Sequence, residues 1–267
     1  MATATAYLDR VLPAIDRLGE RFAALVTSAP DPAAPIPDSA WTVRDATAHV
    51  VTVARRYIDG PEGRGTWVPD PRDLAALNDT QIEALGDLDM GELAARLRRD
   101  LTALAAQLRA YGTAPPSFRF HGGEPVAADV ALGILLGELV VHGWDIARAV
   151  ARPWPIDPGD VELILDGVEP ILPGWVDHEH AGDLTATFEV RLRGGSTRRW
   201  SFRNGRLDTT SPSTDRPDVH ISADPAALLL VFYRRESQWS HIARGHMLAW
   251  GRRPWLAFTL ATRFHTP

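Results

Sequence analysis

Apolar residues recur every three to four positions through the first half of the chain, which is the period of an α-helix. This spacing predicts helices over residues 4–28, 43–58, 72–86, 89–111 and 126–151. Loops rich in proline and glycine separate the helices, and Thr42 with Asp45 three positions later forms a capping-box signal. An antiparallel four-helix bundle is the simplest way to bury the apolar faces of the long helices together.

The pattern changes after the segment Pro-Trp-Pro at 153–155. A helical stretch over 160–180 gives way to residues that alternate between apolar and polar, the period of a half-buried strand. Strands are predicted at 185–193, 198–203, 206–210 and 218–222, and helices at 225–235, 238–245 and 252–264. We therefore expect a small antiparallel sheet with helices on one side. The whole chain is predicted to be α+β with two domains, residues 1–153 and residues 154–267.

The composition excludes several classes of chemistry. The chain has no cysteine, which excludes disulfides, thiolate metal ligands and a cysteine nucleophile. All 28 basic residues are arginine, which excludes Schiff-base chemistry on a lysine. The net charge of −6 argues against a nucleic-acid partner. No apolar run is long enough to span a membrane and no secretory signal is evident, so we expect a cytoplasmic protein.

Two polar residues interrupt the apolar segment 133–148, one helical turn apart. Glu138 and His142 are at positions i and i+4, so their side chains lie on the same face of the predicted helix. A carboxylate and an imidazole are costly to bury unless something pairs them. We expect a divalent metal to do so, with His49 from the buried face of helix 43–58 as the third ligand. A His-Glu-His set suits zinc, and also nickel, iron or manganese.

Each of these residues also has a simpler explanation. Glu138 and His142 could form a hydrogen bond within their helix, and His49 could be a core histidine bonded to a backbone carbonyl. The position of Glu138 among leucine, isoleucine, valine and glycine favours the metal hypothesis. Three protein ligands would leave coordination positions open, as catalytic metal sites do.

Other polar residues are candidates for supporting roles. Asp145, three positions after His142, could orient that ligand, or it could pair with Arg148 instead. Arg234 and Arg235 lie at the end of an apolar helix. They could bind a carboxylate or the sugar oxygens of a substrate, or only the carbonyl groups at the helix C-terminus.

The remaining histidines that we considered are weaker candidates. His121 lies beside paired glycines in a loop, where its side chain could be exposed or could face a cleft. His178 and His180 lie in a loop without apolar neighbours, so we expect them on the surface. His241 and His246 are five positions apart, a poor match to one helix face, and we expect them to be structural.

Two segments closely resemble the signatures of a known family. Trp41-Thr-Val-Arg-Asp-x-x-x-His49 and Glu138-x-x-x-His142-Gly-Trp-Asp-x-Ala-Arg148 are similar to those of the maleylpyruvate isomerase N-terminal domain family. That family comprises mycothiol-dependent enzymes of the DinB-like four-helix metalloprotein superfamily. The pattern Gly-His-Met-Leu-Ala-Trp-Gly-Arg-Arg-Pro-Trp-Leu at 245–256 resembles the sterol-carrier-like domain often fused behind it. The resemblance implies a DinB-like bundle, a sterol-carrier-like C-terminal domain, and a zinc ion held by both histidines and the glutamate of these signatures.

The resemblance also implies a function. Such a protein would be a zinc-dependent S-transferase or isomerase that activates mycothiol or a related thiol, because a metal-bound thiol loses its proton near neutral pH. The thiolate would attack a small electrophilic substrate. The C-terminal domain would cover the open end of the bundle, and the protein would be a monomer or homodimer without a nucleic-acid or membrane partner.

Two alternatives remain open at this point. One is a non-catalytic protein that binds an apolar small molecule and carries a structural metal. The other is a metal-dependent hydrolase of the same superfamily, with water in place of the thiol on the metal. A coordination position that faces a polar cleft would favour either enzyme over the binding protein.

Overall fold

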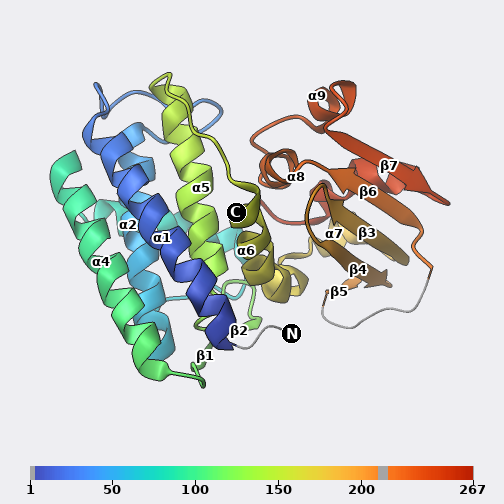
Figure 1. Ribbon diagram of the computed structural model, residues 1–267, viewed down its shortest axis with the longest axis horizontal. Coiled ribbons are helices and arrows are strands. Elements are labelled where there is room, and N and C mark those ends of the chain that lie inside the picture. The colour runs from blue at the N-terminus through green and yellow to red at the C-terminus, as the bar shows by residue number, and fades with distance from the viewer. Residues whose placement is uncertain (1–3, 210–215, 267) are drawn as a thin grey trace.

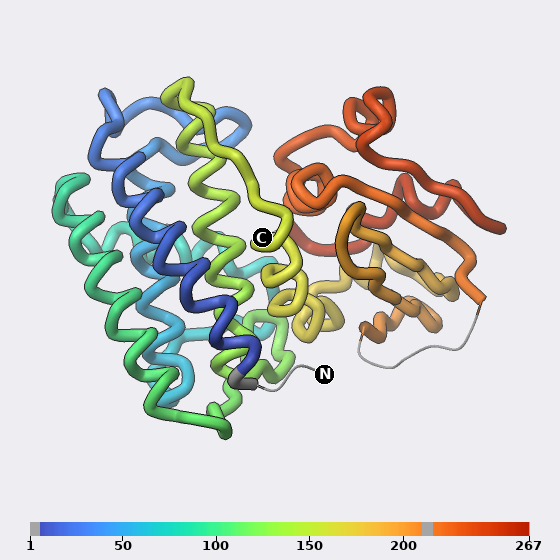
Figure 2. The backbone as a smooth tube through the Cα atoms, viewed as in Figure 1, coloured from blue at the N-terminus to red at the C-terminus, as the bar shows by residue number. Residues whose placement is uncertain are grey.

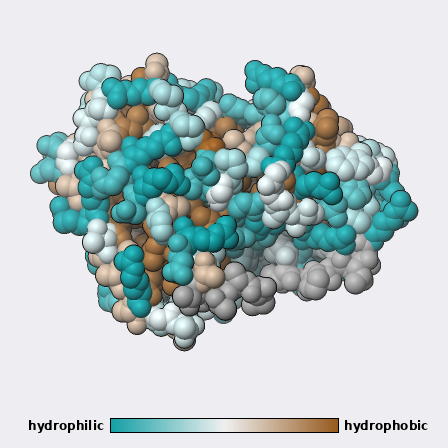
Figure 3. Space-filling view, viewed as in Figure 1, coloured by the Kyte–Doolittle hydropathy of each residue, from teal (hydrophilic) through white to brown (hydrophobic). Residues whose placement is uncertain are grey.

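The computed structural model describes residues 4–209 and 216–266, with a helical half and a half that contains a sheet (Figure 1). The first half holds the helices α1 Ala4–Thr27, α2 Val43–Asp59, α3 Leu74–Glu83, α4 Met90–Tyr111 and α5 Leu132–Ala149. Helix α1 packs on α4 and α5, α2 packs on the same two helices, and the short α3 lies against α2. The predicted four-helix bundle is confirmed. Hydrophilic residues cover much of the face that Figure 3 shows, with apolar residues in narrow patches between them.

A capping box determines where α2 begins. The Thr42 side chain accepts a hydrogen bond from the backbone N–H of Asp45, and the Asp45 carboxylate accepts one from the N–H of Thr42. Both bonds satisfy donors that the first turn of a helix leaves without partners. With this start, one buried face of α2 carries both His49 and Arg56.

Helix α5 begins later than predicted. Strand β1 (Ser117–Arg119) pairs with β2 (Pro125–Ala127) in an antiparallel hairpin, and Gly122 and Gly123 in its turn have positive φ. The residues that start the predicted helix 126–151 belong to this hairpin and the turn after it. Periodicity could not reveal the hairpin, because its pairing joins two short segments on either side of a loop.

The second half contains a five-stranded sheet. Its helices are α6 Pro158–Val168, α7 His178–Ala181, α8 Pro225–Phe232 and α9 Gln238–Ala243, and its strands are β3 Ala186–Leu192, β4 Thr197–Arg203, β5 Arg206–Asp208, β6 Val219–Ala223 and β7 Met247–Gly251. The strand order is β5-β4-β3-β6-β7. Strands β3 and β6 are parallel and the other neighbours are antiparallel, so the prediction of a purely antiparallel sheet was wrong. Alternation has the same period of two in both kinds of pairing, so it cannot give strand direction.

The described residues also form short 3₁₀ helices, some of them in place of predicted α-helix. They are η1 Gly60–Glu62, η2 Pro71–Asp73, η3 Glu169–Trp175, η4 Pro254–Thr259 and η5 Ala261–Arg263. Helix α6 ends at Val168, and η3 follows it because Pro170 and Pro173 have no N–H to continue the α-helix. The predicted closing helix 252–264 is wrong, since η4 and η5 occupy it after the unpredicted strand β7. The last residue of the predicted strand 206–210 lies outside the described residues.

One face of the sheet is covered by α6, α8 and the C-terminal segment. The ring of Trp200 in β4 lies 5.7 Å from that of Phe232 in α8 and 6.4 Å from that of Phe264. Arg198 in the same strand forms ion pairs with Glu162, Asp166 and Glu169, which lie along α6 and at its end. The α+β fold class with an N-terminal bundle is therefore confirmed, while the likeness of the sheet half to a sterol carrier stays a prediction.

Helix α6 joins the two halves of the molecule, and Figure 2 shows its path between the bundle and the sheet. The hydroxyl of Tyr7 in α1 donates a hydrogen bond to the Leu163 carbonyl in α6, 3.0 Å away. Gly133 in α5 faces Gly167 in α6, where a Cβ atom would have no room. The predicted domain boundary after residue 153 stays a prediction. Among the described residues, no helix is long and apolar enough to cross a membrane.

Candidate active site

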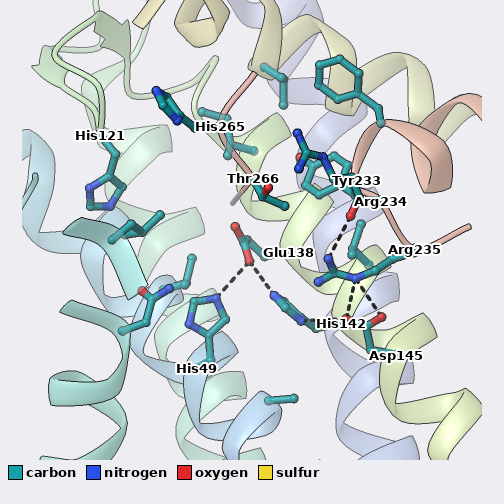
Figure 4. A pocket seen from close by; sticks show the side chains of 18 of the residues that line it. His49, His121, Glu138, His142, Asp145, Tyr233, Arg234, Arg235, His265 and Thr266 are labelled. Carbon is teal, nitrogen blue, oxygen red and sulfur yellow. Dashed lines mark hydrogen bonds and ion pairs between the residues drawn. The ribbon is translucent and has the colours of Figure 1, made fainter. Parts of the chain in front are cut away.

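The structure brings His49 of α2 together with Glu138 and His142 of α5 (Figure 4). The Nε2 atoms of His49 and His142 each lie 3.2 Å from Glu138 Oε2. All three side chains have one donor atom within 4.8 Å of the others. Both histidines are buried, and the glutamate is partly exposed.

The spacing of these donor atoms matches that of a metal site. Two ligands about 2.0–2.1 Å from a tetrahedral zinc ion lie roughly 3.3 Å apart. The two Nε2–Oε2 distances of 3.2 Å are close to this value. Two imidazole nitrogens and one carboxylate oxygen are also a donor set that zinc and similar divalent metals accept. These residues could therefore hold a metal with little rearrangement.

The electrostatics of the cluster favour a charged carboxylate. Burial alone would raise the pKa of Glu138, but hydrogen bonds from His142 and His49 lower it well below its ordinary value. Burial lowers the pKa of His49, so this imidazole stays neutral, which is the form in which a histidine binds a metal. For His142, burial is outweighed by the carboxylates of Asp145 and Glu138, which raise its pKa.

Side chains around the cluster orient the two imidazoles. The ring of Trp41, just before the start of α2, lies 4.8 Å from that of His49 and 5.9 Å from that of His142. Asp145 Oδ2 lies 3.2 Å from His142 Nδ1, at ion-pairing distance but outside good hydrogen-bond alignment. Arg235 Nε in turn donates to both Asp145 carboxylate oxygens, at 3.0 and 3.1 Å.

The cluster lies in the wall of a cavity of about 370 Å³ that both halves of the molecule enclose. Helices α2, α3 and α5 supply much of its wall, and the segments after α8 and after η5 supply the opposite side. The lining mixes aromatic rings with polar groups, which suits a small organic substrate. The aromatic members are Trp41, Tyr57, Trp67, Phe120, Trp175, Phe232, Tyr233 and Phe264.

Asp145, Arg234 and Arg235 also line this cavity. The partner of Asp145 is Arg235, whereas Arg148 lies 3.9 Å from Asp38. Arg234 donates to the backbone carbonyls of Ala261 and Phe264. Substrate binding by the two arginines stays a prediction, and in this structure both guanidinium groups already have acceptors within the chain.

The other candidate histidines lie in the cavity lining, on the surface or, for His241, in the core outside the cavity. His121 lines the cavity and is buried. His178 and His180 are exposed in α7, with His180 paired to Asp177. His241 and His246 lie with their Nδ1 atoms 3.5 Å apart, outside the cavity lining.

Sequence reasoning missed Tyr57, Asn78 and above all Arg56, which lines the cavity although it carries a charge. Arg56 follows His49 by seven positions, so both share a helix face. That spacing was available in the sequence. Charged residues are seldom buried, however, so spacing alone did not single out this arginine.

Comparisons with known proteins agree with this fold. The family model of the mycothiol maleylpyruvate isomerase N-terminal domain matches residues 12–147. Two uncharacterised proteins of Mycobacterium tuberculosis, from strains CDC 1551 / Oshkosh and ATCC 25618 / H37Rv, are each 29% identical over 149 residues. The matched region is 55% of this chain and 71% of each relative.

Two solved structures are similar over most of their length. The crystal structure of a mycothiol-dependent maleylpyruvate isomerase has a TM-score of 0.54 at 18% identity and covers 89% of this chain and 94% of its own. The crystal structure of a histidine-to-alanine mutant of that enzyme has a TM-score of 0.51 at 16% identity. The match covers 86% of this chain and 90% of the mutant chain. At these identities the likeness concerns the fold.

Proposed function

Because the chain belongs to the family of the mycothiol maleylpyruvate isomerase N-terminal domain, we propose that it is a metal-dependent enzyme that uses a low-molecular-weight thiol as cosubstrate. The thiol is mycothiol or a relative, and the second substrate is a small electrophile. The metal is zinc, held by His49, Glu138 and His142. The enzyme acts as a thiol S-transferase or as an isomerase.

The observation that carries the proposal is the geometry of the three donor atoms on the wall of a cavity that also has a polar lining. A structural metal site is closed by four protein ligands, whereas these three donors would leave a position open to the cavity, so the non-catalytic binding protein is less well supported. The absence of cysteine means that a thiol nucleophile has to come from a cosubstrate.

Bound zinc would supply Lewis acidity that lowers the pKa of a thiol. The residues of the chain have separate tasks. His49, Glu138 and His142 would present three donors and leave room for a ligand from the cavity, while Arg235 would hold Asp145 in place beside His142. The aromatic lining would exclude water from a reactive thiolate.

Isomerisation of a cis alkene by this chemistry needs no other reactant. The thiolate sulfur adds to one alkene carbon, the π-electron pair moves onto an adjoining carbonyl group of the substrate as an enolate, and the resulting C–C single bond can rotate. Elimination of the same thiolate then restores the double bond in the trans form. In a transfer reaction the sulfur instead displaces a leaving group, which departs with its electron pair.

The first experiment measures metal in protein purified without chelators. We expect about one divalent ion per chain in the wild type, and loss of metal and activity in His142→Ala and Glu138→Ala. Circular dichroism should show that both variants keep their helices, since the four-helix core is built from other residues. Wild-type protein without any divalent metal would contradict the proposal.

The second experiment separates the thiol-dependent reaction from hydrolysis. Maleylpyruvate, which the structural relatives are named for, is incubated with the zinc-loaded protein with and without mycothiol and followed by NMR. The transferase and isomerase hypotheses predict turnover only with the thiol. Turnover of this or another electrophile with water alone would favour the hydrolase.

A further inference from the structure

Arg56 is a buried cation whose hydrogen-bond acceptors are all neutral. It is 6% exposed and lines the cavity. Its Nε donates to Gln81 Oε1 and its Nη2 to Asn78 Oδ1, each at 2.6 Å. Among the described residues it forms no ion pair with a carboxylate, although a buried charge is costly without one.

The third nitrogen of this guanidinium group faces another donor. Arg56 Nη1 lies 3.5 Å from His121 Nε2. His121 Nδ1 accepts a hydrogen bond from the backbone N–H of Val68 at 3.1 Å, so Nδ1 carries no hydrogen. The hydrogen of the imidazole is therefore on Nε2. Two N–H donors therefore lie close together, and neither has a hydrogen-bond acceptor among the described residues.

More donors lie on the same wall. The hydroxyl of Tyr57 is buried and has no hydrogen-bond partner within residues 4–209 and 216–266. The amide of Asn78 uses its oxygen for Arg56, which leaves its NH₂ group as a donor. Glu138 is a carboxylate of the cavity that interacts with Arg56 over a longer range. It is already paired with His49 and His142. This part of the wall therefore has several donors and a positive charge, and among the described residues no carboxylate pairs with that charge.

From this arrangement we infer that Arg56 and His121 bind a carboxylate of the electrophilic substrate, with Tyr57 and Asn78 as further donors. An oxygen between Arg56 Nη1 and His121 Nε2 would satisfy both N–H groups and compensate the buried charge. The inference rests on the proposed function only in assigning the anion to the electrophile. The anion site itself depends on neither metal nor thiol.

The decisive variant supplies the missing carboxylate from the protein. In Asn78→Asp, a carboxylate oxygen would lie where Asn78 Oδ1 now accepts from Arg56. The variant should fold at least as stably as the wild type, because the buried guanidinium gains an ion pair. It should nevertheless bind an external anion about ten- to hundredfold more weakly. If Asn78 served only to connect α3 to α2, its replacement would not weaken anion binding while stability is kept or raised.

Matched controls are available in the chain. Asn204→Asp adds the same charge in an exposed hairpin turn and should not change anion binding. If Asn78→Asp does not fold, Gln81→Glu places a carboxylate on the other acceptor of Arg56. Arg56→Lys keeps the charge but loses the forked geometry, and it should weaken binding about tenfold.

The probes are acetate and its uncharged isostere acetamide, titrated by calorimetry into the full chain. The wild type should bind acetate in preference to acetamide, and so should His142→Ala, which removes a proposed metal ligand. Equal binding of the two probes, unchanged acetate binding in Asn78→Asp, or loss of acetate binding in His142→Ala would each overturn the inference. Loss of acetate binding in His142→Ala would mean that the anion binds to the metal.

A kinetic comparison tests which substrate carries the anion. Iodoacetate and iodoacetamide both alkylate a thiol with release of iodide, and the chain has no cysteine to compete. With mycothiol, the wild type should favour iodoacetate relative to the uncatalysed reaction, and Asn78→Asp should lose that preference without a change in KM for the thiol. A rise in the thiol KM with an unchanged preference would overturn the assignment to the electrophile. Acetate binding by calorimetry is measured without turnover. That binding result therefore stands even if the protein lacks the proposed thiol-dependent activity.

Discussion

At the scale of single residues, His121 shows how burial controls a charge state. Burial and the neighbouring Arg56 lower the pKa of His121 to about 3, with Glu138 acting weakly in the opposite direction. The ordinary pKa of about 6.5 applies in the unfolded chain. Between these values the unfolded state binds more protons than the folded state, so folding stability falls as the pH falls below 6.5.

The variant His121→Asn tests this linkage. The asparagine oxygen can still accept the bond from Val68 N–H, but the side chain no longer titrates. Between pH 7 and pH 5 the wild type should lose about 2 kcal/mol more stability than the variant. Urea denaturation at both pH values measures the difference. Equal losses in the two proteins would show that His121 is accessible to protons in the folded state.

The sequence predicted the residues of the candidate metal site better than their surroundings. Glu138 and His142 share a helix turn, so local spacing was enough to associate them. His49 was predicted as the third ligand from its place on the buried face of its own helix, and the structure brings all three together. The pairing of Asp145 with Arg235 joins residues that are 90 positions apart, and no local pattern predicts such a contact.

At the scale of elements, the contact of α5 with α6 depends on glycines. A Cβ added to Gly133 would lie 2.3 Å from the Leu163 carbonyl oxygen and 2.9 Å from the Gly167 Cα. Both contacts are with backbone atoms, which cannot move aside without separating the helices. This close approach positions α6 and, through the ion pairs of Arg198, the sheet.

The variant Gly133→Ala should therefore destabilise the protein by about 1–3 kcal/mol. Helix propensity alone predicts the opposite sign, a gain of about 1 kcal/mol. Gly91→Ala is the matched control, because Gly91 is exposed in the first turn of α4 and a Cβ would meet only a side-chain oxygen of Asp89, at 3.2 Å. Chemical denaturation measures the free energy of unfolding of both variants. A Gly133→Ala variant that is more stable than the wild type would refute the packing argument.

Element boundaries were predicted best where a local signal exists. The start of α2 agrees with the capping box of Thr42 and Asp45. The hairpin β1–β2, the strand β7 and the parallel pairing of β3 with β6 were not predicted. The hairpin strands have three residues each, too few to show a period, and the parallel pairing of β3 with β6 joins strands far apart in the chain.

At the scale of the whole molecule, the second half completes the cavity beside the bundle. Arg235, from the turn after α8, holds Asp145 of α5 through two hydrogen bonds. If the proposed metal site is right, Arg235→Met should weaken zinc binding about 10- to 100-fold, because Asp145 would no longer be held beside His142. Competition with a fluorescent chelator measures the affinity.

The control for that variant is Arg252→Met. Arg252 also pairs with an aspartate, Asp218, but outside the cavity lining. Its removal should leave zinc affinity unchanged. Equal affinities for wild type and Arg235→Met would mean that the C-terminal half contributes only to the shape of the cavity.

The sequence by itself determined the helical first half, the α+β class, the exclusion of chemistry on a cysteine or lysine side chain, and the Glu138–His142 pair. Each of these depends on composition or on spacing within one element, and both are local properties of the chain. The tertiary structure alone decided that Arg56 and His121 face each other as donors and that Arg235 supports Asp145. These contacts depend on which distant elements pack together and on where each hydrogen bond finds its acceptor.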